Sequence, residues 1–210
     1  MKKISIFFTA VFFFFTTATV NADSDDYKKF FIGAGGSYGI ENFDGGGDFD
    51  NTWGVNAKIG YHLLDELAVQ FDYDYLREFE DKEGIDLFGD SFDGKAELEI
   101  MTYILSLKGN FRVKWYQVIS PYIIAGLGIM HADADYKISG AGISMDSSSD
   151  ETDLCGKIGG GFDFLLTENL SVNLEGNYTL GFRDLEDIQY FHFILGGVFR
   201  FDLPYGNHEF

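Results

Sequence analysis

The segment from Phe191 to Phe201 alternates between two kinds of residue along its whole length. Every second position is large and apolar or Gly, whereas the positions between them include His192 and Arg200. A two-residue period places the two kinds on opposite faces of a β-strand. One face of this strand therefore meets an apolar environment while the other meets polar groups, and any fold for the chain must satisfy both.

The chain begins with the basic head Met1-Lys2-Lys3, followed by an apolar run from Ile4 to Val20. The small residues before Asp23 fit a cleavage site, and the run lacks a basic stop signal, so we expect a cleaved signal peptide over residues 1–22 and not a retained anchor. No other segment approaches the ~20 apolar residues of a spanning helix. A mature chain that enters a membrane must therefore do so as a closed sheet.

The composition excludes some classes of protein. The net charge of −19 falls to −21 when Lys2 and Lys3 leave with the leader, which argues against nucleic acid as a partner. Cys155 is the single cysteine, so an internal disulfide cannot form and the fold must be held by sheet closure or a large core. The length of the mature chain suits one domain.

Seven further segments show the same two-residue period, so the sequence predicts eight strands. The segment 121–130 is rich in glycine and its facing is ambiguous, but we favour an outward orientation for Ile123, Ala125, Leu127 and Ile129. The expected strands span residues 30–40, 52–63, 67–75, 101–110, 121–130, 154–164, 170–180 and 191–201.

The predicted connections alternate in length. Those after the second, fourth and sixth strands are brief, whereas those after the first, third and fifth are long, near 41–51, 77–96 and 132–152. Short periplasmic turns and long external loops are typical of an up-and-down outer-membrane barrel. We therefore predict an all-β fold, an eight-stranded antiparallel up-and-down transmembrane β-barrel over residues 23–201, in the bacterial outer membrane, with a C-terminal tail at 202–210.

A soluble barrel with its apolar face inward is the main alternative fold, because alternation alone does not say which side is the core. The polar face of such a barrel would be ordinary surface, crowded with Lys and Glu. Here that face is rich in Gly, Ser, Thr and Asn with sparse charges. We also find no Gly-x-Trp opening strand of the lipocalin type and no cystine, so the membrane barrel is favoured.

The inward positions of the predicted barrel carry as many cations as anions. An eight-stranded barrel is barely wide enough for its own side chains, and buried charges persist only when paired. We expect an ion-pair network that fills the lumen, with His62 and His192 as further members and not metal ligands. The predicted network consists of Lys58, Asp72, Asp74, Lys108, Lys157, Asp163, Glu175 and Arg200.

Tyr and Trp on the apolar face gather toward the strand ends. Aromatic residues at these levels form the interfacial girdle of membrane barrels, although packing against another protein is the alternative interpretation. The predicted girdle consists of Tyr38, Trp53, Tyr61, Tyr73, Tyr75, Tyr103 and Tyr178.

Three segments resemble the small eight-stranded outer-membrane barrels grouped around the transmembrane domain of outer-membrane protein A and the opacity-like surface antigens. They are the glycine-rich strand Phe31 to Gly36, the Pro-Tyr-x-x-x-Gly-x-Gly strand Pro121 to Gly128, and the closing strand at Phe199-Arg200-Phe201. The resemblance implies location, fold and assembly by the barrel-assembly machinery. It does not imply one activity, since its members serve as adhesins, surface antigens and envelope-stabilising proteins. Because a tail ending in Phe210 follows the last strand, the candidates for the assembly signal are Phe199, Phe201 and Phe210.

The three long connections hold most of the negative charge, with net charges of −4, −5 and −5 over residues 41–51, 77–97 and 131–153. The cluster Asp44, Asp48 and Asp50 is a weak calcium candidate, but no complete calcium-loop motif is present and solvated surface charge is the simpler interpretation. We predict no cofactor. Anionic loops beside anionic lipopolysaccharide repel it unless divalent cations bridge them, so we expect Ca²⁺ or Mg²⁺ to affect stability.

Catalysis is the competing class of function, because some outer-membrane barrels modify lipids. Eight-stranded lipid A deacylases place a Ser two residues after the catalytic His, a spacing that none of the four His residues shows. We find no nucleophile–base pair at a recognisable spacing and predict no enzyme.

The sequence therefore predicts a non-enzymatic surface protein that acts through acidic external loops, in adhesion, as a surface antigen or in envelope integrity. Its expected partners are outer-membrane lipid and lipopolysaccharide, the barrel-assembly machinery, and a host or matrix ligand of the loops. The alternative function is a small porin-like ion channel gated by the lumen network.

Overall fold

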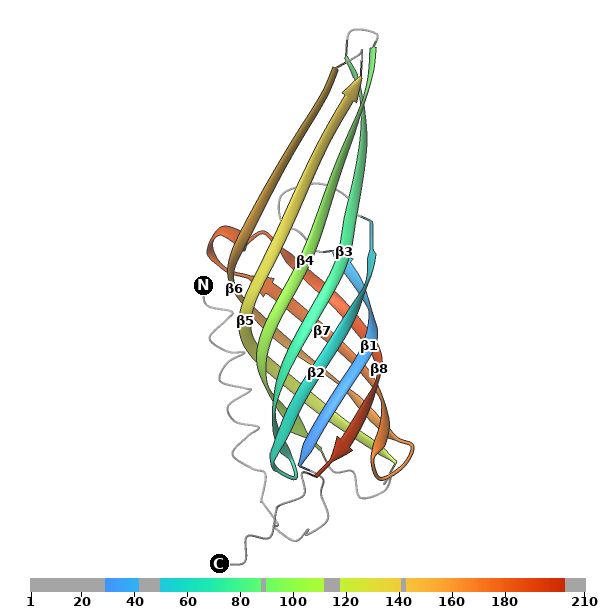
Figure 1. Ribbon diagram of the computed structural model, residues 1–210, viewed down its shortest axis with the longest axis vertical. Coiled ribbons are helices and arrows are strands. Elements are labelled where there is room, and N and C mark those ends of the chain that lie inside the picture. The colour runs from blue at the N-terminus through green and yellow to red at the C-terminus, as the bar shows by residue number, and fades with distance from the viewer. Residues whose placement is uncertain (1–28, 42–49, 88–89, 112–117, 141–142, 203–210) are drawn as a thin grey trace, which may run out of the picture.

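The strands of this protein form a closed barrel (Figure 1). The computed structural model describes residues 29–41, 50–87, 90–111, 118–140 and 143–202. The elements are β1 (Phe30–Glu41), β2 (Thr52–Leu64), β3 (Leu67–Leu87), β4 (Asp90–Asn110), β5 (Ile119–Gly140), β6 (Ile143–Leu165), β7 (Leu170–Gly181), the 3₁₀ helix η1 (Arg183–Leu185) and β8 (Gln189–Phe201). Each strand pairs antiparallel with the next, and β8 pairs with β1 to close the sheet. The predicted fold class is confirmed.

The two-residue period decides which side chains point out of the barrel. On β2, Trp53 is 68% exposed and Ile59 54%, whereas Lys58 is buried at 6%. On β5, Leu127 is exposed and Ile124 is buried, which confirms the favoured orientation of that strand. The apolar face is thus on the outside and the polar face lines the lumen, as a barrel in a bilayer requires.

Two of the three predicted long loops are wrong, because the chain there continues as strand. The β3–β4 hairpin remains paired up to Leu87↔Asp90, and the β5–β6 hairpin up to Gly140↔Ile143. β4 and β5 also pair as far as Asp93↔Ser139, so the two hairpins form one sheet. The residues near 77–96 and 132–152 therefore belong to a four-stranded extension that rises beyond the barrel rim (Figure 1).

The remaining connections lie at the two ends of the barrel. The turn between β2 and β3 and the turn between β6 and β7 are brief, as predicted. Most of the predicted 41–51 loop, the leader 1–22 and the tail after Asp202 lie outside the described residues. None of the described residues belongs to a helix long and apolar enough to cross a membrane.

Candidate functional site: a packed lumen and an acidic extension

Asp163 on β6 is the centre of the part of the lumen nearest the periplasmic end. Its Oδ2 accepts from Lys108 Nζ at 2.9 Å and from Arg200 Nη2 at 2.9 Å, and its Oδ1 accepts from Asn173 Nδ2 at 2.9 Å. Arg200 Nη1 donates to Ser171 Oγ at 2.8 Å. Two cations from opposite parts of the barrel therefore share one buried carboxylate, which is the kind of pairing that buried charge needs.

Glu175 on β7 makes a second centre beside the first. Its Oε2 accepts from Lys58 Nζ at 2.9 Å and from the Tyr122 hydroxyl at 2.6 Å, while its Oε1 accepts from Asn177 Nδ2 at 2.8 Å. Asn173 links the two centres, because its Nδ2 also donates to the Tyr122 hydroxyl at 2.7 Å. The four strands β2, β5, β6 and β7 are thereby joined across the lumen.

Lys157 makes the third centre, closer to the external end. Its Nζ lies 2.7 Å from Asp72 Oδ2 and 3.9 Å from Asp74 Oδ2, and its side chain is inaccessible to solvent. Asn56 Nδ2 donates to Asp74 Oδ1 at 2.7 Å, and His192 Nε2 lies 3.9 Å from the same oxygen. All eight charged residues predicted for the lumen thus lie in ion pairs of an electroneutral set.

Two apolar clusters pack against these charges, and the larger one lies toward the external end. Near the periplasmic end, Phe31, Ala68 and Val198 form a small buried cluster, and His62 packs against the Phe31 ring at 5.2 Å between ring centroids. A larger cluster lies toward the external end and continues along the inner face of the extension. It consists of Leu76, Phe79, Leu98, Ile100, Ile104, Met130, Ala132, Cys155, Leu185 and Tyr190.

Leu185 is the one member of this external cluster that does not come from a strand. It lies on η1 in the β7–β8 connection and is 3% exposed. Arg183 before it has φ 54°, in the left-handed region that costs a non-glycine residue energy. A side chain at Gly181 would collide with the backbone of Leu185, so Gly is required where the connection folds back over the lumen. The connection therefore inserts an apolar side chain into the mouth of the barrel.

The alternation on β4 reverses its phase between Ile100 and Met101. Toward the periplasm, the outward positions are apolar, with Tyr103 43% and Leu105 60% exposed. Beyond the reversal, Glu99 takes the outward position while Leu98 and Ile100 point inward and are buried. The side chains that point out of β4 thus meet lipid below this point and water above it. The side chains that point inward remain in a packed core on both sides of it.

β5 shows the same reversal, since outward Ile129 is followed by outward Asp133 and Asp135. The pairing then places acids side by side across three strands. Glu99 lies opposite Asp133, which lies opposite Asp150 on β6, and Glu97 lies opposite Asp135. Because residues directly opposite share one face of a sheet, these acids form two rows on the outer face of the extension.

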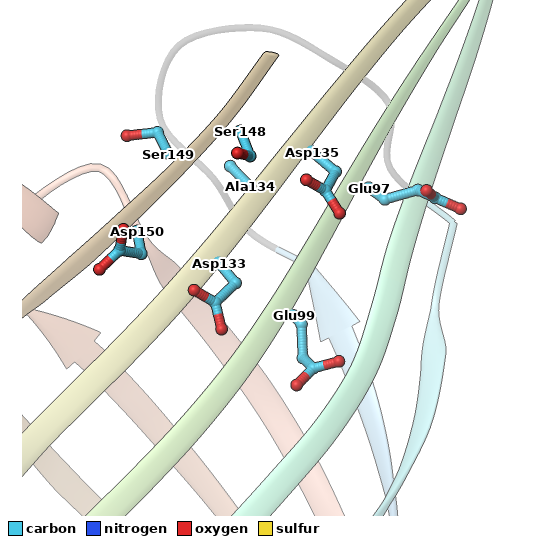
Figure 2. A pocket seen from close by; sticks show the side chains of 8 residues that line it. All are labelled: Glu97, Glu99, Asp133, Ala134, Asp135, Ser148, Ser149 and Asp150. Atoms are coloured by element: carbon cyan, nitrogen blue, oxygen red, sulfur yellow. The ribbon is translucent and has the colours of Figure 1, made fainter. Parts of the chain in front are cut away.

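The two rows line a hollow of about 380 Å³ with Ser148 and Ser149 on β6 (Figure 2). Like charges in directly opposite positions destabilise a sheet, so packing does not explain them. Glu97 is partly compensated, because hydrogen bonds from the Lys95 and Lys137 ammonium groups hold its pKa below the usual value. We name the set Glu97, Glu99, Asp133, Asp135 and Asp150 the acidic face.

The predicted girdle residues all lie at outward positions. Tyr38 packs against Trp53 at 4.8 Å between ring centroids, and Tyr73 packs against Tyr103 at 5.2 Å. Tyr75 lies just beneath the acidic face and its hydroxyl donates to Glu99 Oε2 at 3.0 Å. Tyr61 packs against Phe30, and Tyr178 packs against Phe191.

Among the candidates for the assembly signal, Phe199 and Phe201 point outward and stack on each other at 6.2 Å between ring centroids. Phe210 lies outside the described residues, as do Asp44 and Asp48 of the weak calcium candidate, while Asp50 is exposed. Within the described part of the chain, no group of three or more His, Cys, Asp or Glu side chains is arranged to hold a metal ion.

Sequence reasoning missed the neutral partners of the lumen charges and the apolar cluster above them. Tyr122 is buried at 3% and bonds both Glu175 and Asn173, a role that its place in a glycine-rich strand did not indicate. The phase reversal is visible in Glu97-Leu98-Glu99-Ile100, but the acid-rich composition on either side of it is typical of loops. Leu185 gave no signal, because its burial depends on how the β7–β8 connection folds back over the lumen.

The family model described as outer membrane protein beta-barrel domain matches residues 7–201 of the chain. This protein belongs to that family. It is therefore a bacterial outer-membrane β-barrel, and the predicted resemblance and location are confirmed. No curated protein matches the chain by sequence.

Solved structures of other outer-membrane barrels share the fold. The attachment invasion locus protein Ail of Yersinia pestis is 22% identical, with a TM-score of 0.55 over 83% of this chain and 99% of Ail. Neisserial surface protein A is 15% identical, with a TM-score of 0.59 over 82% of this chain and 97% of the other. OprG from Pseudomonas aeruginosa is 18% identical, with a TM-score of 0.53 over 85% and 98%. At these identities the likeness concerns the fold alone.

Proposed function

We propose that this outer-membrane barrel is a non-enzymatic surface protein that binds an external ligand through its extension. The observation that carries the proposal is the acidic face, which presents two rows of carboxylates on a continuously paired sheet outside the lipid-facing band. A paired sheet holds these groups in fixed positions, so a ligand does not have to order a loop on binding. Like charges in opposite positions destabilise the sheet, and a bound cationic group would offset that cost.

The charge of the acidic face supports a cationic ligand. Ail has been solved in complex with the heparin analogue sucrose octasulfate, which is an anion. Such a ligand would be repelled by the rows that contain Glu99, Asp133 and Asp150. We therefore propose that this protein also binds an outside partner, but that its ligand is not an anion of that class.

The filled lumen supports an anchoring role for the barrel and argues against the alternative of an ion channel. Conduction requires one sign of charge along an open path, whereas here the charges are paired and a large apolar cluster lies toward the external end. Planar-bilayer recording tests this point. Stable single-channel steps that change in Lys108→Ala or Arg200→Ala would support the channel instead.

The test of ligand binding compares three forms of the protein displayed on bacteria. One is the natural chain, one has both hairpins of the extension shortened to the rim, and one carries Glu99→Gln, Asp133→Asn and Asp150→Asn. Surface amount is matched by labelling, and folding by the shift in gel mobility on boiling. We expect attachment to host cells or matrix to be lost in both variants, and unchanged attachment after shortening would refute the proposal.

A further inference from the structure

Among the described residues, the part of β6 from Ile143 to Leu154 has a strand neighbour on only one side. β6 pairs with β5 from Ile143 onward, but its pairing with β7 begins only at Cys155↔Gly181. The β7–β8 connection adds a hydrogen bond from the Phe182 amide to the Leu154 carbonyl at 3.0 Å. Beyond Leu154, no backbone of the described chain pairs with this edge, which forms one side of the extension in Figure 1.

The direction of the free backbone groups follows from that last hydrogen bond. The N–H and C=O of one strand residue point to the same edge, and the edge alternates from residue to residue. Since the Leu154 carbonyl points away from β5, the backbone groups of Thr152, Asp150 and Ser148 point the same way. Ser147, Ser148 and Ser149 are exposed and small, so another backbone can approach closely. Such an edge is a template for strand addition.

The negative charges beside this edge determine which partner segments can pair with it. Natural proteins protect edge strands with charged side chains, and here Asp150, Glu151 and Asp153 serve that role. Because these charges are all acidic, they repel a second copy of this acidic chain and any acidic segment. They do not repel a cationic one, and the acidic face lies beside the same edge.

We propose that the β6 edge at 147–153 binds an extended, Lys- or Arg-rich segment of a partner protein as an additional strand. This rests on the proposed function and names both the class of partner and the side of the extension that it occupies. The backbone of the segment pairs with Thr152, Asp150 and Ser148. Its alternate side chains lie on the outer face beside Asp150, where the hollow of the acidic face receives their charged ends (Figure 2).

The test uses the full chain, refolded in nanodiscs of zwitterionic lipid so that the lipid does not attract the probe. The probe is a fluorescein-labelled dodecapeptide of alternating Lys and Thr, and binding is followed by fluorescence anisotropy. Its control has the same sequence and charge but methylated backbone nitrogens, so it cannot donate to an edge. We expect the control to bind roughly tenfold more weakly or worse, because several backbone hydrogen bonds are lost together.

Variants of the protein test the edge separately from the charge. Ser148→Pro removes an N–H that points away from β5 and leaves the pairing with β5 intact, so it should weaken binding, whereas Ser148→Ala should not. Asp133→Asn with Asp150→Asn should also weaken binding. Retention of the heat-dependent gel shift shows that each variant is folded.

Equal binding of the methylated peptide, unchanged binding to Ser148→Pro, or no binding of either peptide would overturn the proposal. These results are distinct from failure of the proposed function, which shows as attachment that survives removal of the extension. If attachment requires the extension but neither peptide binds, the strand-addition inference is refuted and the proposed function is not.

Discussion

Removing the charge of Glu175 should cost more stability than removing any surface charge. The carboxylate is 1% exposed and accepts from Lys58, Tyr122 and Asn177 within 2.9 Å. In Glu175→Gln the volume is kept, but the Lys58 ammonium group loses the carboxylate with which it pairs in the described part of the chain. Breaking a buried pair in this way costs about 3–5 kcal/mol.

The assay is equilibrium urea unfolding of the protein in lipid vesicles, followed by intrinsic fluorescence. Glu168→Gln is the matched control, since it makes the same chemical change at an exposed turn position and should stay within about 0.5 kcal/mol. Lys58→Met added to Glu175→Gln should recover part of the loss, because it removes the unpaired cation. The double-mutant cycle then measures the coupling between the two side chains.

The result that refutes this reasoning is a loss below about 1 kcal/mol for Glu175→Gln, the range of exposed ion pairs, together with no coupling to Lys58. It would mean that water reaches the pair and that the lumen is not packed as the distances indicate. The same result would favour the channel over the anchoring role.

Three further outcomes are expected. Leu185→Ala should speed labelling of Cys155 by a small charged thiol reagent roughly tenfold or more. Loss of a buried Leu side chain costs about 2 kcal/mol or more, and Cys155 is fully buried in the same cluster. An unchanged rate would contradict an apolar closure by the β7–β8 connection. Replacing Lys95 and Lys137 by Ala should raise the pKa of Glu97 in an NMR titration. Because the pKa of Glu97 is lowered in the folded state, its ionised carboxylate stabilises the fold above the ordinary carboxyl pKa. That contribution to stability is lost as the pH falls through the pKa of Glu97 in the folded protein. EDTA should lower the thermal stability of the barrel in lipopolysaccharide-containing membranes, and unchanged unfolding would show that divalent cations do not bridge the acidic surface to the lipid.

The barrel itself could be predicted from the sequence because a bilayer makes the rule simple. Lipid on one side and a narrow lumen on the other impose a strict two-residue period, so the facing of Trp53 and Lys58 could be assigned without coordinates. The lumen charges could be grouped for the same reason, since few positions point inward. Which cation meets which anion could not, because it depends on the register between strands distant in sequence, as between Lys108 and Asp163.

The extension was not predicted because two signals pointed to different structures. A high density of acids, Gly and Ser is typical of loops, and the opposing signal is the short alternation in Glu97-Leu98-Glu99-Ile100, which covers only four residues. Above the membrane, a strand reverses its pattern, since water now lies outside while the inner face still packs on Phe79 and Met130. A search for alternation of either phase would have found it.

The reversal predicts where a charge is tolerated on the outer wall of β4. Leu105 lies toward the lipid-facing centre and is 60% exposed, so Leu105→Arg should destabilise the barrel by about 2–4 kcal/mol in vesicles. Glu99→Arg occupies the same face six residues earlier, beyond the reversal, and should cost at most about 1 kcal/mol, because water surrounds the new charge there. Both variants place an Arg on the outer face and are compared by detergent-free urea unfolding. Glu99→Arg also removes the hydrogen bond that the Tyr75 hydroxyl donates to Glu99, which is included in its expected loss. Equal losses would place the membrane boundary elsewhere and would put the acidic face within the lipid instead of above it.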